Sequence, residues 1–209
     1  MAIERHFVKE GIKEAEIEEF FKEKFDKAGY SHIEIQRTPL GTRIIVYADR
    51  PGLVIGKYGT RIKEITDEVQ KKFQLENPML DVKEIESPLL DAQVVAGKIT
   101  KALERGAFYK KIANWYVSEV MKAGAVGIEI RIAGKLGGER SRFQKFKEGY
   151  IKHAGYYADN VVDKGKAVAT TKPGTVGVQV KILRNLPEIT TRIKEVEKVE
   201  DKGNEKTES

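Results

Sequence analysis

A short glycine-containing segment between two apolar stretches restricts the fold of this chain more than any other feature. Gly56 and Gly59 are three residues apart and enclose Lys57 and Tyr58. Because glycine lacks a Cβ atom, the backbone can approach a ligand closely there. The free amides and positive dipole end of a helix that starts after Gly59 favour an anion, and Lys57 and Arg61 add full charges. The segment is therefore suited to a phosphate backbone.

The elements predicted around this loop follow the order α-β-β-α-α-β and close near residue 86. The first helix shows an apolar stripe that Gly29 ends. The members of this stripe are Ile17, Phe20, Phe21 and Phe25. Residues 31–38 and 42–47 are rich in β-branched and apolar side chains, which predicts a hairpin. A short helix precedes the loop, a long helix follows it, and residues 80–85 alternate as in a strand.

The segment has two other interpretations. It could be an ordinary turn between helices, with a solvated lysine and tyrosine. From Gly52 onward it also superficially resembles a nucleotide-binding P-loop. However, Gly52 and Gly56 are one residue too close for a P-loop, and Tyr58 stands where a serine or threonine must bind magnesium. The P-loop interpretation is therefore disfavoured.

A second unit, residues 87–187, is predicted to be a two-layer α/β structure with a mainly antiparallel sheet. Ser87-Pro88 is typical of a helix start. The first helix is expected to bury Val95, Ile99, Ala102 and Leu103. A second helix is predicted at about residues 107–123. Its apolar face consists of Tyr109, Ile112, Ala113, Tyr116, Val117 and Val120. The chain as a whole is thus predicted to be α+β.

Strand and turn patterns dominate the rest of the second unit. Ile128, Ile130 and Ile132 alternate with polar residues, as in a half-buried strand. Phe143 and Phe146, three residues apart, indicate a helical segment. The remaining predicted strands are residues 156–162, 166–171 and 176–183, the last two joined by a type II turn at Pro173-Gly174. Residues 188–209 lack a sufficient apolar stripe and are expected to be disordered or a fraying helix.

Positive charge is concentrated in the middle of the chain. The formal net charge is +6, yet residues 1–29 hold six basic and eight acidic side chains, and residues 188–209 hold five and seven. Residues 105–152 carry eleven basic and four acidic side chains, a net charge of +7. A basic region with acidic flanks points to a polyanionic partner.

Several classes of protein are disfavoured by the residues present. The chain has no cysteine, which excludes disulfides, thiol nucleophiles and cysteine-ligated zinc. Its three histidines, His6, His32 and His153, lack ligand-like spacing, so no metal site, cofactor or catalytic site is expected. The N-terminus does not read as a signal peptide, and no run is apolar for long enough to span a bilayer. A cytoplasmic location is expected.

The N-terminal pattern, residues 1–86, resembles a type II KH domain with an N-terminal extension. Three further stretches widen the resemblance: residues 87–96, residues 103–111 and the Gly-Ile-Glu-Ile-Arg-Ile-Ala-Gly-Lys-Leu-Gly-Gly run at 127–138. Over about residues 5–185 the chain is similar to the family of the third universal protein of the small ribosomal subunit. Residues 7–12 are similar to its archaeal and eukaryotic branch.

This resemblance implies a ribosome-bound structural protein on the head of the small subunit. It implies binding of ribosomal RNA, contacts with neighbouring small-subunit proteins, and a place lining the channel where messenger RNA enters. Lys110 and Lys111 match family positions on the second helix that face the messenger, whereas Asn114 stands where bacterial members add a basic residue. The alternative for both lysines is a solvated helix face. Trp115 is expected to pack at the domain interface.

The candidate RNA-binding residues come from the loop, the second helix and the basic region after it. The loop could hold either ribosomal or messenger RNA. The basic residues from 131 to 147 are interpreted as positioning RNA phosphates rather than reading bases. The full set is Gly56, Lys57, Tyr58, Gly59, Arg61, Lys63, Lys110, Lys111, Arg131, Lys135, Arg140, Arg142, Lys145 and Lys147.

Two rival functions remain at the level of sequence. A free-standing KH-domain regulator of messengers would share the glycine loop but would not need the second unit. A lysine-dependent lyase acting on nucleic acid would need a lysine with a depressed pKa, and no lysine has a sequence context that predicts one. Neither rival accounts for both halves of the chain.

Overall fold

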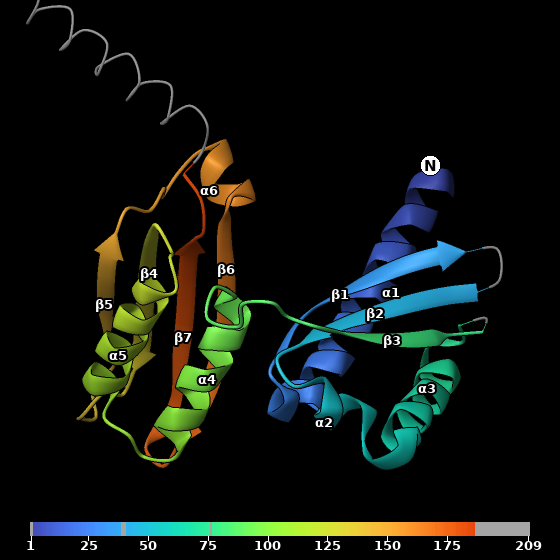
Figure 1. The fold of residues 1–209 in the computed structure, drawn as a ribbon, viewed down its shortest axis with the longest axis horizontal. Coiled ribbons are helices and arrows are strands. Elements are labelled where there is room, and N and C mark those ends of the chain that lie inside the picture. The colour runs from blue at the N-terminus through green and yellow to red at the C-terminus, as the bar shows by residue number, and fades with distance from the viewer. Residues whose placement is uncertain (1, 39–40, 76, 187–209) are drawn as a thin grey trace, which may run out of the picture.

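Two β-sheets, one in each half of the chain, organise the structure (Figure 1). The computed structural model describes residues 2–38, 41–75 and 77–186. The first sheet has three strands and the second has four. Each sheet has its own cluster of buried apolar side chains. The predicted tail, residues 188–209, lies outside the described residues.

The first half has the predicted α-β-β-α-α-β order. Its elements are α1 (Ala2–Phe25), the 3-10 helix η1 (Asp26–Ala28), β1 (Tyr30–Thr38), β2 (Gly41–Ala48), α2 (Pro51–Ile55), η2 (Lys57–Gly59), α3 (Thr60–Phe73) and β3 (Met79–Glu84). Strand β1 pairs antiparallel with β2, which confirms the predicted hairpin, and β2 pairs parallel with β3.

Aromatic side chains of α1 form the centre of the first core. Phe21 and Phe25 are almost fully buried. The ring of Phe20 meets that of Phe73 on α3 edge-on, with the ring centroids 5.9 Å apart. Burial of each such side chain contributes about 1.5–3 kcal/mol. The chain then turns at Gly29, whose φ is +75°, and a Cβ there would lie 2.7 Å from the Cβ of Asp49. The predicted end of the first helix therefore requires glycine.

Tyr30, at the start of β1, carries a buried hydroxyl with no hydrogen-bond partner among the described residues. Burial, and secondarily the negative charge of Glu18, raise the pKa of this phenol, so it stays protonated. Because an unsatisfied buried hydroxyl is unfavourable, Tyr30→Phe should increase the free energy of unfolding by about 1 kcal/mol. Thermal denaturation of both proteins measures this. A lower melting temperature for Tyr30→Phe would show that the hydroxyl has a bound partner, such as a water molecule.

The second half stacks two long helices on one face of an antiparallel sheet. Its elements are α4 (Ala92–Glu104), α5 (Tyr109–Lys122), β4 (Gly127–Gly134), β5 (Arg142–Gly149), α6 (Tyr156–Asn160), β6 (Val162–Thr171) and β7 (Gly174–Leu183). The strand order is β5-β4-β7-β6, and every neighbouring pair is antiparallel. The predicted α+β class and two-layer second unit are confirmed.

The alternation of β4 divides the second sheet into two faces. Ile128, Ile130 and Ile132 are fully buried and pack with apolar residues of α4, α5 and β7. Arg131 lies on the opposite face and is exposed. Figure 1 shows α4 and α5 together on one side of the sheet. Within the part of the chain that the structure describes, no long helix packs on the other side, which carries Arg131.

Two predictions of secondary structure were wrong. The segment with Phe143 and Phe146 is strand β5, not a helix. Phe146 packs against the second core, whereas Phe143 is 61% exposed, so the two rings point to opposite faces of a strand. Residues 156–162 were predicted as a strand, but α6 occupies Tyr156–Asn160 and strand β6 begins only at Val162.

Three local predictions also need correction. Ser87-Pro88 lies in a turn, because α4 begins at Ala92 with Asp91 as its N-cap. The β6–β7 turn places Lys172 and Pro173 between the paired residues Thr171 and Gly174, so Pro173-Gly174 is not its central pair. Trp115 is 55% exposed on α5 and meets the ring of Tyr116 edge-on, rather than packing between the two halves.

Asp91 joins the two halves at the start of α4. It is buried and accepts hydrogen bonds from the hydroxyl of Ser31 on β1 and, at 2.9 Å, from the amide of Val94. Capping of this kind typically contributes about 1 kcal/mol. Two ion pairs from α4 to the first half add to this contact, Lys98–Asp49 at 3.1 Å and Lys101–Asp26 at 3.3 Å.

Candidate RNA interface

The glycine loop between α2 and α3 is held in a conformation that its residue types explain. Gly56 and Gly59 have φ values of +74° and +72°, and Tyr58 between them also has a positive φ of +54°. A Cβ on Gly56 would lie 2.7 Å from the Cβ of Arg61. Both glycines are therefore required by the backbone, since left-handed conformations are strained for most L-residues.

Polar groups of this loop face solvent. Tyr58 is fully exposed, and Lys57, Arg61 and Lys63 are exposed as well. No side chain caps the first turn of α3. The amide of Thr60 donates to the carbonyl of Lys57, so the amides after it are the ones available to an anion. Arg61 donates a hydrogen bond of 3.1 Å to the carbonyl of Leu53 in α2, which fixes its cation beside the loop. The sequence-predicted residues of the loop thus form one exposed, positively charged surface.

The exposed face of α5 carries Lys110 and Lys111. A short connection, residues 123–126, joins the end of α5 to the start of β4, and α5 packs on β4. The beginning of α5 therefore lies near the end of β4, where the loop of residues 135–141 starts. Lys135 and Arg140 belong to that loop and are exposed. These four cations share one end of the second sheet.

The remaining members of the predicted basic cluster do not all share a surface. Arg131 on β4 is paired in register with Lys145 on β5, so both side chains lie on the face away from the helices. Lys147 has the same parity as Lys145 and lies on that face too. Arg142 has the opposite parity and lies on the helix side of the sheet. The register thus separates Arg142 from the other three.

The same face holds cations that the sequence reasoning missed. Strand pairing brings Lys166 on β6 and Lys181 on β7 to the same face as Arg131, although they are 35 and 50 residues away in the sequence. Gln179 lies between Arg131 and Lys166 in the same row. The alternation of polar and apolar residues along 176–183 was the available signal, but only the register places these residues beside β4.

Titratable groups outside these surfaces offer little for acid–base chemistry. Burial raises the pKa of Tyr116, which keeps that phenol neutral. His32 stacks on Tyr47 with ring centroids 4.4 Å apart and shares a 2.8 Å hydrogen bond with Ser31. Among the described residues, no three His, Cys, Asp or Glu side chains are grouped to hold a metal. Nor does any helix in this part of the chain have the length and apolar character needed to cross a membrane.

Comparison with known proteins matches both halves of the chain. The KH domain family matches residues 16–90, and the family described as Ribosomal protein S3, C-terminal domain, matches residues 99–182. The small ribosomal subunit protein uS3 of Methanocaldococcus jannaschii is 53% identical over 182 residues, which cover 87% of this chain and 88% of that protein. These matches confirm the resemblance drawn from the sequence.

Other relatives agree. The small ribosomal subunit protein uS3 of Methanococcus vannielii is 49% identical over 87% of this chain and 86% of its own length. The protein of the same name from Natronomonas pharaonis is 45% identical over 88% of this chain, but the match spans only 60% of that longer relative. Identity of this level over most of the chain is sufficient to assign it. The chain belongs to the family of small ribosomal subunit protein uS3.

Proposed function

We propose that this ribosomal protein binds ribosomal RNA through the glycine loop and helps to line the channel by which messenger RNA enters the small subunit. Its family is one of structural ribosomal proteins, not of enzymes, which removes the lyase interpretation. The glycine loop carries the proposal, because uncapped amides at the start of α3 and exposed cations meet there without any nearby catalytic group.

The proposed channel contact is the end of the second sheet where Lys110, Lys111, Lys135 and Arg140 gather. Four exposed cations at one edge suit a phosphate backbone that passes by without being read base by base. We propose that Lys110 and Lys111 face the messenger. Lys135 and Arg140 would contact the same strand or the adjacent ribosomal RNA.

The remaining proposals concern organisation and partners. We place the boundary between the two domains after residue 86, in the segment before the Asp91 cap. Ribosomal RNA, messenger RNA at the entry channel and neighbouring small-subunit proteins are the proposed partners, in the cytoplasm. A free-standing regulator would wash off small subunits in high salt, whereas a resident protein should co-sediment. Loss of the chain from subunits washed in this way would contradict the proposal.

Replacing both Lys110 and Lys111 with alanine should leave subunit assembly intact and weaken the hold on messenger downstream of the decoding site. Because each lost phosphate contact on single-stranded RNA lowers the slope of log affinity against log salt by about 0.7, the slope should shrink by about 1.4. Subunit occupancy should be measured first, and messenger affinity then determined at several salt concentrations.

Lys122→Ala is the matched control for this pair, since Lys122 is exposed at the other end of the same helix and pairs with Glu119 across one turn. It should leave the slope unchanged. Normal occupancy with an unaltered slope in the double variant would mean that Lys110 and Lys111 are a solvated helix face.

A further inference from the structure

The face of the second sheet opposite α4 and α5 has a regular arrangement of side chains. One row across the four strands consists of Lys145, Arg131, Gln179 and Lys166. The next row towards the start of β4 consists of Lys147, Glu129, Lys181 and Lys164. We call these two rows, together with Phe143, the open face. It presents six cations from strands that are about 4.8 Å apart.

The only carboxylate in the two rows is largely withdrawn from solvent. Glu129 is 6% exposed, and the ring of His153 lies 3.8 Å from its carboxylate. The segment of residues 150–155 covers this end of the face, with Ile151 buried against Val162 and Leu183. A ligand on the open face therefore meets lysine and arginine rather than Glu129.

An exposed aromatic ring stands beside the cations. Phe143 is 61% exposed, and the guanidinium of Arg131 lies over its ring, 4.9 Å from the centroid. The residues beside Phe143 in its own row are Ala133 and Gly177, which leave a flat floor next to the ring. A planar group can therefore lie against the side of Phe143 that Arg131 does not cover.

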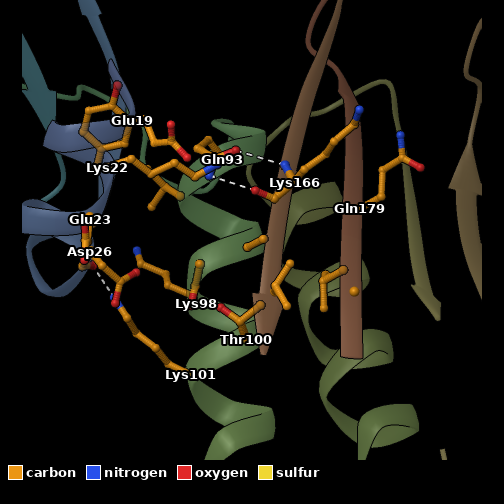
Figure 2. A pocket seen from close by; sticks show the side chains of 18 of the residues that line it. Glu19, Lys22, Glu23, Asp26, Gln93, Lys98, Thr100, Lys101, Lys166 and Gln179 are labelled. Carbon is orange, nitrogen blue, oxygen red and sulfur yellow. Dashed lines mark hydrogen bonds and ion pairs between the residues drawn. The ribbon is translucent and has the colours of Figure 1, made fainter. Parts of the chain in front are cut away.

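Part of the open face lines a cleft of about 970 Å³ between the two halves, since Arg131, Gln179 and Lys166 are among the residues that line it. Figure 2 shows Lys166 and Gln179 on the sheet side of this cleft and Glu19 and Glu23 on α1 across from them, with α4 between. The carboxylates of α1 are balanced in this cleft by basic lining residues, namely Lys22, Lys98, Lys101, Arg131 and Lys166. Phe143, Lys145, Lys147 and Lys181 are not among the lining residues, so this part of the open face lies outside the cleft.

We propose that the open face binds single-stranded RNA, with one base stacked on Phe143 and phosphates beside Arg131, Lys145, Lys147 and Lys181. This inference rests on the proposed function, because it assigns a third RNA-binding surface to the same ribosomal protein, beside the glycine loop and the end of the second sheet. A helix-backed antiparallel sheet with an exposed aromatic residue and surrounding cations has the chemistry of a stacking platform. Duplex RNA would keep its bases inside and would not reach the ring.

The binding test uses the full chain and a labelled oligouridylate of about ten nucleotides. Phe143→Ala should weaken binding about tenfold, since base stacking on an aromatic side chain contributes on this scale. Phe143→Tyr keeps the ring and should bind within about twofold of wild type. Lys145→Ala with Lys147→Ala should lower the salt slope by about 1.4. Lys122→Ala, on the helix side of the sheet, is the control for loss of one charge.

The same substitutions at Phe143 should also be made in a chain that carries Lys57→Asp and Tyr58→Asp. The loss caused by Phe143→Ala should be the same factor in both backgrounds, because the two surfaces are separate. If Phe143→Ala binds as tightly as wild type, the open face is not a platform, whatever the loop variant does. If the loop variant alone has no effect, the glycine loop fails while the open face stands.

A cross-link in assembled subunits decides the class of partner. A photoreactive benzoylphenylalanine in place of Phe143 should form adducts with RNA. Adducts with a neighbouring protein instead would overturn the proposal and make the open face a protein-docking surface. Circular dichroism of each variant should match wild type, since Phe143, Lys145 and Lys147 are exposed.

Discussion

Changing Lys57 and Tyr58 together to aspartate should weaken binding of ribosomal RNA on the order of 100-fold, because about 3 kcal/mol separates a favourable charged contact from like-charge repulsion. The change removes one cation and adds two carboxylates at the start of α3, where an anion is otherwise favoured. The fold should persist, since Tyr58 is fully exposed. Aspartate also tolerates the positive φ at position 58 better than most residues.

A control with the same change in charge is available on α3 itself. Gln70→Asp with Lys71→Asp alters the net charge equally, and both positions are exposed. They lie about 20 Å from the loop along the helix, which exceeds the Debye length of about 8 Å at physiological salt. This variant should bind RNA nearly as well as wild type. RNA affinity and circular dichroism should be measured on the same samples.

Equal losses in the loop variant and the α3 control would indicate that only the overall charge of the first domain matters. Unchanged affinity of an intact loop variant would remove the glycine loop from the proposed interface. Either outcome would leave the family assignment in place, because that assignment rests on identity over most of the chain.

The first domain was predictable because its signals are local. The apolar stripe of α1, the hairpin residues and the two glycines each act within one or two turns of chain. The α-β-β-α-α-β order could therefore be drawn from the sequence, and the loop conformation followed from Gly56 and Gly59. The length of α1 was not indicated, because residues before Ile17 lack the regular apolar spacing that α1 shows later.

The predictions of secondary structure failed where pairing with a distant part of the chain overrides the local spacing of apolar residues. Phe143 and Phe146 fit a helical period, but β5 pairs with β4 along eight residues and places one ring on each face. Ser87-Pro88 has the chemistry of a helix start, yet Asp91 is the better cap in this structure. One carboxylate oxygen of Asp91 accepts from the amide of Val94, and the other accepts from the hydroxyl of Ser31 on β1. That second contact comes from 60 residues away and leaves no local signal.

The glycine loop and the open face also differ in how far the sequence predicts them. The glycine loop is one contiguous motif, so all of its exposed residues could be named in advance. The open face is assembled from four strands, and the sequence alone named only Arg131, Lys145 and Lys147 there, with Arg142 wrongly expected in the same cluster. Lys181 and Lys166 belong to this face only through the register of β7 and β6.

Gly165→Val should destabilise the chain by at least about 3 kcal/mol, because the added side chain has no space. A Cβ at Gly165 would lie 2.1 Å from the carbonyl oxygen of Ala92 and 2.5 Å from the amide nitrogen of Gln93, both backbone atoms at the start of α4. The helix must move away from β6 to admit it. For a chain of this size, the melting temperature should fall by roughly 6–12 °C.

Gly97→Ala is the matched control within α4. A Cβ at Gly97 meets no atom within 4 Å, so alanine adds only helix propensity there. This variant should gain about 0.5–1 kcal/mol. Opposite shifts of melting temperature for the two substitutions would separate the close approach at Gly165 from any general sensitivity of α4. A wild-type melting temperature for Gly165→Val would show that α4 does not sit on β6 as described.

Amide hydrogen exchange can show which part of the structure Gly165→Val disturbs. The amide of Ala92 donates to Asp163 at 2.9 Å, and the side chain of Gln93 both accepts from the amide and donates to the carbonyl of Lys166, at 2.9 and 3.1 Å. These bonds close the outer edge of β6, which would otherwise be open to pairing with another strand. Displacement of α4 by Gly165→Val breaks them, so exchange at Ala92 and Lys166 should accelerate, while exchange in the β1–β2 hairpin should change little. Because α4 also carries the Asp91, Lys98 and Lys101 contacts to the first domain, the same variant should be depleted from small subunits. This loss is expected even though all three proposed RNA-binding surfaces keep their residues.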